Sequence, residues 1–484
     1  MTASLPDPSA TPAPPAPPAP PAPFDRTIVA GPIPRAVWMI AWPTMLQNVV
    51  GGVQGMVDHA LVGHFVGYAG NAAIGVAIQI FIVVIAFVMA VVSGMAVLVA
   101  RFAGAGDPDK VNRTVYQAFL AGVALWALVL APLGWVLAPA LLGVVHAAPA
   151  VRAAALPFLR ILFVGSVGML VFFLVSGALR AAGDARTPLR LGILYTAVNI
   201  VCNVAFITGL GPLPRLGAAG AAVGTTVAGL ALSGLALWLL RSGTLAIRWH
   251  RGMDRRPDWG VIRALFRFGL PTGIQGIAMN VAGVLLLRFI GSLAESAQAQ
   301  AAYAVGYTEL FSLVTWTSVG LMGAAATVAG QNLGAGRPER AVRAVHVAAG
   351  IGLGVAALVG VLFLAVPRAL FGLFGLTEGS VVAIGTQLLM FLSVSGLFVT
   401  VALAYTGGLQ GTGDTRSPLY ISLVSQIVVP LGLCALFQAR GGLQPAEIWT
   451  AIVLGHVTRC GLSVARFRQG KWRHIRVDIA AART

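Results

Sequence analysis

Twelve long apolar segments dominate this sequence and leave few folds open to it. A helix that crosses a bilayer needs about 20 mostly apolar residues. Only 10% of the residues are charged, against about 25% in ordinary soluble domains, so the chain cannot cover itself with polar surface. We therefore predict an all-α integral membrane protein with twelve transmembrane helices. The segments lie at about 36–62, 72–100, 114–138, 156–178, 189–210, 217–240, 261–290, 300–329, 341–366, 381–406, 418–438 and 446–465.

One stretch of this sequence occurs twice, 230 residues apart. Residues 177–189 read GALRAAGDARTPL, and residues 407–419 read GGLQGTGDTRSPL. RFAGAGDPDK and QNLGAGRPER repeat at the same offset, and PTMLQ matches PTGIQ 228 residues further on. Because each half holds an even number of spans, both halves start on the same side of the membrane, as parallel repeats do. We expect two homologous six-helix lobes.

Charge placement indicates how the chain sits in the membrane. Of the 32 Lys and Arg residues, 26 fall on the side that holds both termini and both repeated stretches, and 6 fall on the other. Cytoplasmic loops carry such an excess, so we expect both termini in the cytoplasm and no nucleic-acid partner. The expected parts are a disordered Pro-rich cytoplasmic tail (1–35), an N-terminal lobe (36–243), a cytoplasmic linker (244–261), a C-terminal lobe (262–466) and a basic cytoplasmic tail (467–484).

Signatures of catalysis are absent from the sequence. It contains no GxSxG, Walker A, HExxH or CxxC motif. The three cysteines, Cys202, Cys434 and Cys460, fall inside apolar segments and suggest neither a disulfide framework nor a metal site. We expect no enzyme activity, no cofactor and no bound metal. If the protein pumps a solute, the energy comes from an ion gradient.

The first span carries the clearest polar feature. Gln47, Gln54 and Asp58 are spaced seven and four residues apart, so they share one helix face. A carboxylate inside a bilayer is costly and usually faces the interior of the bundle or a wet cavity. We interpret Asp58 as an ion-coupling residue and the two glutamines as cavity residues. The alternative is an interfacial Asp58 that pairs with His59 or His64.

Other polar residues of the spans are candidates for the same cavity. Asn199 and Asn203 lie one turn apart in the fifth span, and Thr225 lies in the sixth. They either line the cavity with Asp58 or form hydrogen bonds between helices. Glu309 in the eighth span is a second protonation site, a partner for a cationic substrate or a residue capped at a helix bend. Asn280 in the seventh span is a weaker substrate candidate.

The repeated stretches have the residue types of a turn between two helices. Asp after Gly suits a turn or helix cap, and Pro suits the first turn of the next helix. We interpret these residues as structural, forming a hinge and a cap. They are Gly183, Asp184, Arg186, Pro188, Gly413, Asp414, Arg416 and Pro418.

The same motifs carry a family resemblance over nearly all of 36–466. PTMLQN with VDHALVGHFVG, NIVCNVAFITG, LGAAGAAVGTTVA and AGQNLGAGRPERA stand in order around the repeated stretches. In this respect the chain resembles the MATE family, the multidrug and toxic compound extrusion transporters. The resemblance implies two six-helix lobes around a central cleft and export of bulky, often cationic organic compounds in exchange for protons or sodium ions. The family's first-span carboxylate corresponds to Asp58, and its protonation or sodium binding beside it would bend that helix.

Two departures from the family pattern bear on the coupling ion. Asn203 stands where members often have Asp, and the seventh span, 271–287, contains no acid. The resemblance therefore implies coupling centred on Asp58 in the first lobe. Sodium favours several oxygen ligands, so we expect proton coupling, with sodium coupling as the alternative.

The expected function is multidrug efflux by a multi-pass protein of the bacterial inner membrane. We expect a monomer surrounded by membrane lipids that exports small organic, cationic substrates. The rival within the same superfamily is a flippase for a lipid-linked precursor, which would need a basic cleft for a phosphate group. The main cations inside the spans are Arg160, Arg288 and Arg459, so we rank the flippase below efflux.

Overall fold

The computed structural model describes residues 24–145, 148–249 and 254–477, which form helices and turns with no strand among them. The first half comprises α1 (Thr27–Ala30), α2 (Ile33–Phe65), α3 (Tyr68–Ala105), α4 (Pro108–Leu125), η1 (Trp126–Leu130), α5 (Ala131–Val144), α6 (Pro149–Ala182), α7 (Arg186–Thr208) and α8 (Ala218–Ser242). The second half comprises α9 (Trp259–Gly291), α10 (Ser296–Tyr303), η2 (Ala304–Leu310), α11 (Ser312–Gly334), α12 (Pro338–Ala365), α13 (Pro367–Gly372), α14 (Gly379–Thr412), α15 (Arg416–Leu423), η3 (Val424–Val428), α16 (Val429–Ala439), α17 (Pro445–Arg468) and η4 (Lys471–His474).

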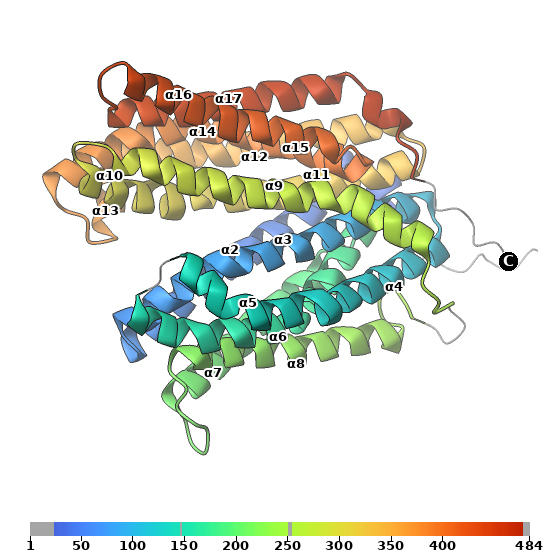
Figure 1. Cartoon of the computed structure of the whole chain (residues 1–484). Coiled ribbons are helices and arrows are strands. Elements are labelled where there is room, and N and C mark those ends of the chain that lie inside the picture. Colours follow the sequence, from blue (N-terminus) through green and yellow to red (C-terminus); the bar gives the residue numbers. More distant parts are fainter. Residues whose placement is uncertain (1–23, 146–147, 250–253, 478–484) are drawn as a thin grey trace, which may run out of the picture.

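The helices lie side by side in two bundles, one from each half of the chain (Figure 1). In the first bundle α6 packs against α3 and α8, and α8 packs against α7. In the second, α14 packs against α11, α12 and α17. Three spans contain a π-helical stretch, η1, η2 or η3, that joins two α-helices into one continuous segment. Counted in this way, the described residues contain the twelve expected spans in two six-helix lobes.

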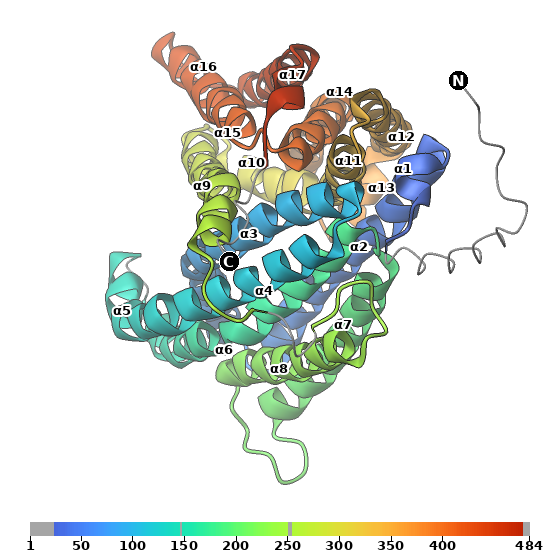
Figure 2. The ribbon, with the colours of Figure 1, turned by 90° about the vertical axis from the view of Figure 1, so that its right-hand side faces the viewer.

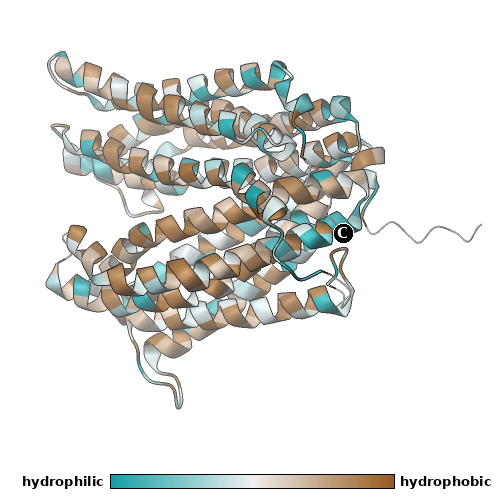
Figure 3. Cartoon of the chain, turned by 45° about the vertical axis from the view of Figure 1, so that its right-hand side comes forward, coloured by the Kyte–Doolittle hydropathy of each residue, from teal (hydrophilic) through white to brown (hydrophobic). Residues whose placement is uncertain are grey.

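Eleven helical segments of the described residues are long and apolar enough to cross a membrane. Large apolar side chains stand on their outer faces, such as Leu358 and Val361 of α12, which are 73% and 63% exposed. The hydropathy colouring shows such residues along both bundles (Figure 3). The twelfth span, α2, has 33 residues but is not among the eleven. Its polar stripe makes it the least lipid-like span, and it packs against α7 and α11.

The chain ends differ in part from the expected tails. Residues 1–23 and 478–484 lie outside the described residues. Within the tail expected at 1–35, α1 and the first residues of α2 are helical, because Ile28 is fully buried against the second lobe and anchors this segment. In the basic tail, Trp472 is 1% exposed and stacks on Phe467. This part of the basic tail therefore packs on the protein.

The repeated stretches form a helix end, a cap and a new helix start. Gly183 ends α6 in the left-handed region at φ +106°, and Gly413 ends α14 at φ +100°. Glycine suits this conformation because it has no Cβ. The Asp184 carboxylate accepts hydrogen bonds from the backbone N–H groups of Arg186 and Thr187, which caps α7.

The second copy of the stretch adds an ion pair to the same geometry. The Asp414 carboxylate accepts from the backbone and hydroxyl of Ser417. Its other oxygen lies 2.8 Å from Nη2 of Arg466 on α17. Pro188 and Pro418 are buried in the first turns of α7 and α15, and Arg186 and Arg416 are exposed at the first position of those helices.

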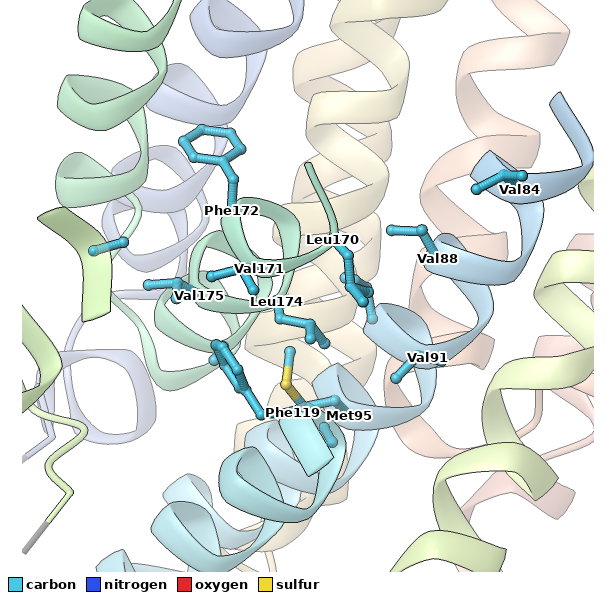
Figure 4. Packing of buried hydrophobic residues seen from close by; sticks show 14 of the residues in the cluster. Val84, Val88, Val91, Met95, Phe119, Leu170, Val171, Phe172, Leu174 and Val175 are labelled. Carbon is cyan, nitrogen blue, oxygen red and sulfur yellow. The ribbon is translucent and has the colours of Figure 1, made fainter. Parts of the chain in front are cut away.

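The core of the first lobe lies between α3, α4 and α6. Met95, Leu174 and Val175 are almost fully buried there, and Phe119 of α4 lies beside them (Figure 4). In lipid, hiding an apolar side chain from solvent contributes little, because the lipid tails are equally apolar. Close packing and small residues must therefore hold these helices together.

Small residues also join the two lobes, along α3, α9 and α11. A methyl group on Gly104 of α3 would lie 1.9 Å from the carbonyl oxygen of Gln331 on α11. One on Gly334 of α11 would lie 2.1 Å from the carbonyl oxygen of Arg101 on α3. Residues 101 and 104 correspond to 331 and 334 in the repeat. The two contacts are thus equivalent and form a pseudo-two-fold pair.

A second pair of close contacts joins α3 to α9. A methyl group on Gly94 would lie 2.0 Å from the carbonyl oxygen of Leu265, and one on Gly269 would lie 1.8 Å from that of Ala90. We call these four glycine contacts the lobe seam. They lie toward the end of the molecule that carries the repeated stretches, which faces the viewer in Figure 2. Backbones in contact leave no room for a solute to pass between the lobes here.

We expect Gly104→Ala to lower the thermal stability of the detergent-solubilised protein. The new methyl meets backbone rather than a flexible side chain, and overpacking of this kind costs about 1–3 kcal/mol. Gly75→Ala on the same helix is the matched control, because a methyl there meets nothing within 4 Å. Replacing a helical Gly by Ala otherwise stabilises by about 0.5–1 kcal/mol. The measurement is the unfolding midpoint by tryptophan fluorescence, and equal midpoints for the two variants would contradict the seam.

Candidate ion-coupling and transport site

The polar face of α2 lies against α7 in the first lobe. The carboxylate Oδ1 of Asp58 accepts a hydrogen bond of 2.7 Å from Nδ2 of Asn203. One turn earlier on α2, Gln54 Oε1 accepts a hydrogen bond of 3.0 Å from the hydroxyl of Thr196. The alternative for Asp58 is pairing with His59 or His64; among the described residues Asp58 forms an ion pair with neither, and Nδ1 of His59 bonds Oδ1 of Asn71 on α3 at 2.6 Å.

The hydrogen bond of Asp58 continues into a chain that crosses three helices. Nδ2 of Asn203 also donates to Oδ1 of Asn199 at 3.2 Å, and Nδ2 of Asn199 donates to the hydroxyl of Thr225 on α8 at 3.0 Å. Both asparagines are fully buried. We call these four residues the Asp58 network. The structure thus brings together the three residues predicted for ion coupling and one predicted for the cavity.

Asn203 holds the central place in this network. Its amide nitrogen bonds both Asp58 and Asn199, while its Oδ1 is buried without a hydrogen-bond partner among the described residues. That oxygen packs against Gly224, where a methyl group would lie 2.1 Å away. Buried polar atoms are usually paired, so this acceptor could take a hydrogen bond from an additional donor.

A cavity of about 520 Å³ lies between the lobes, and we call it the inter-lobe cavity. It is lined from both lobes by α3, α6, α9, α11, α14 and α17. Its floor, with Ala100, Ala181 and Gly411, is within two turns of the helix ends at the lobe seam. Its volume falls in the range of about 300–1,000 Å³ that is typical of small-molecule sites.

Two arginine side chains give the inter-lobe cavity a positive charge. Arg180 of α6 and Arg459 of α17 line it from opposite lobes. Nη1 of Arg180 donates to Oε1 of Gln47 at 2.9 Å, so Gln47 of α2 is linked to the edge of the cavity through Arg180. Sequence reasoning missed Arg180, which it counted with the cytoplasmic loops although it lies inside the last turn of a span.

The other cations of the spans do not line this cavity. Arg160 donates to the carbonyl of Trp135 and lies over its ring, and Arg288 is exposed on α9. The prediction that Arg160, Arg288 and Arg459 are the main cations available to a cleft therefore holds for Arg459 alone. A single arginine among apolar residues of a span normally faces the interior, but this signal applied equally to Arg288 and so could not single out Arg459.

The polar candidates of the second lobe stand apart from the Asp58 network. Glu309 lies in the π-helical stretch η2 and is half-buried, with its carbonyl accepting from the hydroxyl of Ser312. Asn280 is exposed, and its Nδ2 donates to the carbonyl of Gly276 in its own helix. Neither has a recorded side-chain contact with the network or lines the inter-lobe cavity.

A smaller pocket of about 260 Å³ lies inside the second lobe. Tyr303, Tyr307 and His456 line it, and the two tyrosine rings stack at 4.9 Å. His456 bonds the hydroxyl of Ser395. This pocket is aromatic, and its lining contains no Asp or Glu among the described residues. Among the described residues, this pocket therefore contains no counterpart to the carboxylate of the first lobe.

Comparison with known proteins agrees with this architecture. The MatE family model matches residues 43–205 and again 271–436, so the two matches begin 228 residues apart. The chain is 30% identical to the "Probable multidrug resistance protein NorM" of Deinococcus radiodurans, over 90% of this chain and 94% of that protein. It is 26% identical to the "Multidrug resistance protein PmpM" of Pseudomonas aeruginosa, over 90% and 91% of the two chains.

Solved structures show the same fold. One, described as the "Outward-facing conformation of a multidrug resistance MATE family transporter of the MOP superfamily", superposes with a TM-score of 0.85 at 20% identity, over 93% of this chain and 98% of that one. Another, a MATE "in the straight conformation", superposes with a TM-score of 0.84 at the same identity. The family model covers more than half of the chain in two copies, one in each lobe. The chain therefore belongs to the MATE family of multidrug efflux transporters, which are multi-pass membrane proteins.

Proposed function

We propose that this protein is a secondary antiporter that exports bulky organic compounds in exchange for protons, as a monomer in the bacterial inner membrane. Asp58 is the residue that takes up the proton. The observation that carries the proposal is the hydrogen bond from Asn203 to Asp58 inside the first lobe, continued through Asn199 to Thr225. A carboxylate within a span is energetically costly, and such residues usually mark ion pathways or proton relays.

The chemistry of the network suits a proton more than a metal cation. An ionised carboxylate accepts strong, charge-assisted hydrogen bonds, and protonation weakens them. Uptake of a proton by Asp58 therefore loosens its hold on Asn203. An asparagine side chain cannot itself carry a proton at neutral pH, so Asp58 is the single titrating group of this network.

A structural change in the Asp58 network can be transmitted to the second lobe and to the inter-lobe cavity through α2. Gly51 and Gly55 have open space around them, whereas Gly52 packs directly on the ring of Trp316 in the second lobe. Helices bend at glycines and where side chains insert into the helix. A change in α2 at Asp58 therefore reaches Trp316 across the lobe boundary and, through Gln47, reaches Arg180 at the inter-lobe cavity.

The proposed orientation places the lobe seam on the cytoplasmic side, as the charge distribution favours. In that orientation the seam closes the inter-lobe cavity toward the cytoplasm. A proton then arrives from outside, and the substrate leaves in that direction. The return step requires the seam to open, which its four glycine contacts permit without rearrangement of side chains.

The charge of the substrate depends on which part of the molecule it meets. A cationic substrate would compete with a proton for Asp58, and the prediction of a cation rests on that residue. The inter-lobe cavity has two arginines and, among the described residues that line it, no carboxylate. This basic lining favours a substrate with an anionic head group, such as the lipid-linked precursor of a flippase, more strongly than the sequence suggested.

We expect Asp58→Asn to reduce proton-driven transport to the level of empty liposomes, because the amide cannot be protonated. The measurement is uptake of one cationic and one anionic fluorescent dye into proteoliposomes under an imposed proton gradient, and then under a sodium gradient. Asp109→Asn, on an exposed turn at the start of α4, is the control. Retained proton-driven uptake of both dyes in Asp58→Asn would refute the role of Asp58. Uptake driven by sodium alone in the wild type would replace the proton.

We expect Asn203→Leu to impair transport far more than stability. The change removes two hydrogen bonds, each worth about 0.6 kcal/mol on average in a membrane protein, but it disconnects Asp58 from Asn199. Asn280→Leu is the matched control, because Asn280 bonds only its own helix. Transport is measured as for Asp58, and stability as the unfolding midpoint in detergent. A variant that transports normally would show that the network is only structural.

A further inference from the structure

The inter-lobe cavity contains positive charge that the protein itself does not neutralise. Arg459 lies midway along α17 and is 7% exposed. Its Nε is buried without a hydrogen-bond partner, and it forms no ion pair among the described residues. A buried charge is normally paired or placed where a ligand will pair it. Arg459 therefore lacks the counter-charge that its position requires.

Arg180, across the cavity, is in a similar situation. Its recorded partner is the neutral oxygen of Gln47. By contrast, Arg466, two turns beyond Arg459 on the same helix, bonds the Asp414 carboxylate with Nε and Nη2 at 2.8 Å. The chain thus pairs an arginine with a carboxylate just outside the cavity and leaves the two arginines of the cavity without one.

The rest of the lining supplies neutral donors and an apolar wall. Gln275 of α9 and Gln410 of α14 line the cavity from the second lobe, and Nε2 of Gln410 donates to Oε1 of Gln275 at 3.4 Å. Met89, Met279 and Met322 line the cavity as well. Methionine side chains are flexible and polarisable and adapt to apolar ligands of different shape. The lining therefore combines groups suited to a charged head with apolar side chains suited to a bulky apolar body.

We propose that the inter-lobe cavity binds amphipathic organic anions, with a carboxylate, sulfonate or phosphate head on Arg180 and Arg459 and the apolar body against the methionines. The proposal rests on the export function above and assigns its substrate class. The planar guanidinium matches such oxyanions with two parallel hydrogen bonds. Two arginines without a carboxylate repel a cation, and Asp58 does not line the cavity.

The experiment compares two fluorescent probes that differ only in charge. Both consist of a dansyl group on an undecyl chain, and the head is a carboxylate in one and an ammonium in the other. Equilibrium binding to the purified full-length protein in neutral detergent is followed by dansyl fluorescence. We expect the carboxylate probe to bind at least tenfold more tightly than the ammonium probe. Arg459→Gln and Arg180→Gln should each weaken binding of the carboxylate probe about tenfold, the scale of one lost charged hydrogen bond, without weakening the ammonium probe.

Two further variants separate charge from packing. Arg459→Lys keeps the charge but loses the planar fork, so its affinity for the carboxylate probe should fall between wild type and Arg459→Gln. Arg288→Gln removes an exposed arginine of α9 and should leave both affinities unchanged. Equal or tighter binding of the ammonium probe, or full affinity in both Gln variants with native unfolding midpoints, would overturn the proposal. If Arg459→Gln does not fold, the affinities of Arg180→Gln and Arg459→Lys for the carboxylate probe test the proposal in its place.

Competition identifies the source of the anion. Taurocholate represents soluble amphipathic anions, and a polyprenyl phosphate in mixed micelles represents lipid-linked ones. Displacement of the carboxylate probe by one but not the other assigns the source, and displacement by neither overturns the proposal. The binding assay contains no ion gradient. A failure of proton coupling at Asp58 would therefore leave this result intact, and a failure here would leave proton coupling intact.

Discussion

Backbone contact between the lobes is the constraint on which the rest of this structure depends. In a bilayer, apolar helices gain little by hiding from lipid, so close approach through small residues must supply the cohesion. Gly94, Gly104, Gly269 and Gly334 allow α3 to meet α9 and α11 at the backbone. Because residues 101 and 104 correspond to 331 and 334 in the repeat, the Gly104 and Gly334 contacts mark a pseudo-two-fold axis, and all four contacts together close one end of the inter-lobe cavity. The walls of the cavity can then be built from side chains that need not hold the lobes together.

The helix α2 has a different task, and its composition reflects it. A span that only anchors the protein would be apolar all round, whereas α2 is too polar to be counted among the eleven apolar segments. Its polar residues meet partners on three neighbours, with Asp58 on α7, Gln47 on α6 and Asn48 on the carbonyl of Trp316 in α11. The helix that is least stable in lipid is therefore the one with contacts to the Asp58 network, the cavity and the other lobe.

Sequence periodicity predicted the fold well, because span length and the internal repeat are properties of composition and order. It also selected Asp58, Asn199 and Asn203, since a carboxylate and paired amides in spans are rare and must face inward. It could not predict the bond from Asn203 to Asp58, 145 residues away, or the inward position of Arg180. Counting charges by loop assigns a residue to a side of the membrane and contains no information on helix face. Spans that are apolar all round give no amphipathic stripe by which the inward face could be recognised.

The separation of Asp58 from the two arginines has a consequence for the energetics of exchange. Exporting a monovalent cation for one proton moves no net charge across the membrane. Exporting a monovalent anion while a proton enters moves two positive charges inward. At a membrane potential of 100 mV this is worth roughly 4.6 kcal/mol, twice the value for one elementary charge. If the inter-lobe cavity binds anions at Arg180 and Arg459 as proposed, one proton can therefore drive the release of an anion against a steep gradient. One titrating carboxylate, the number that the Asp58 network contains, is then sufficient for the cycle.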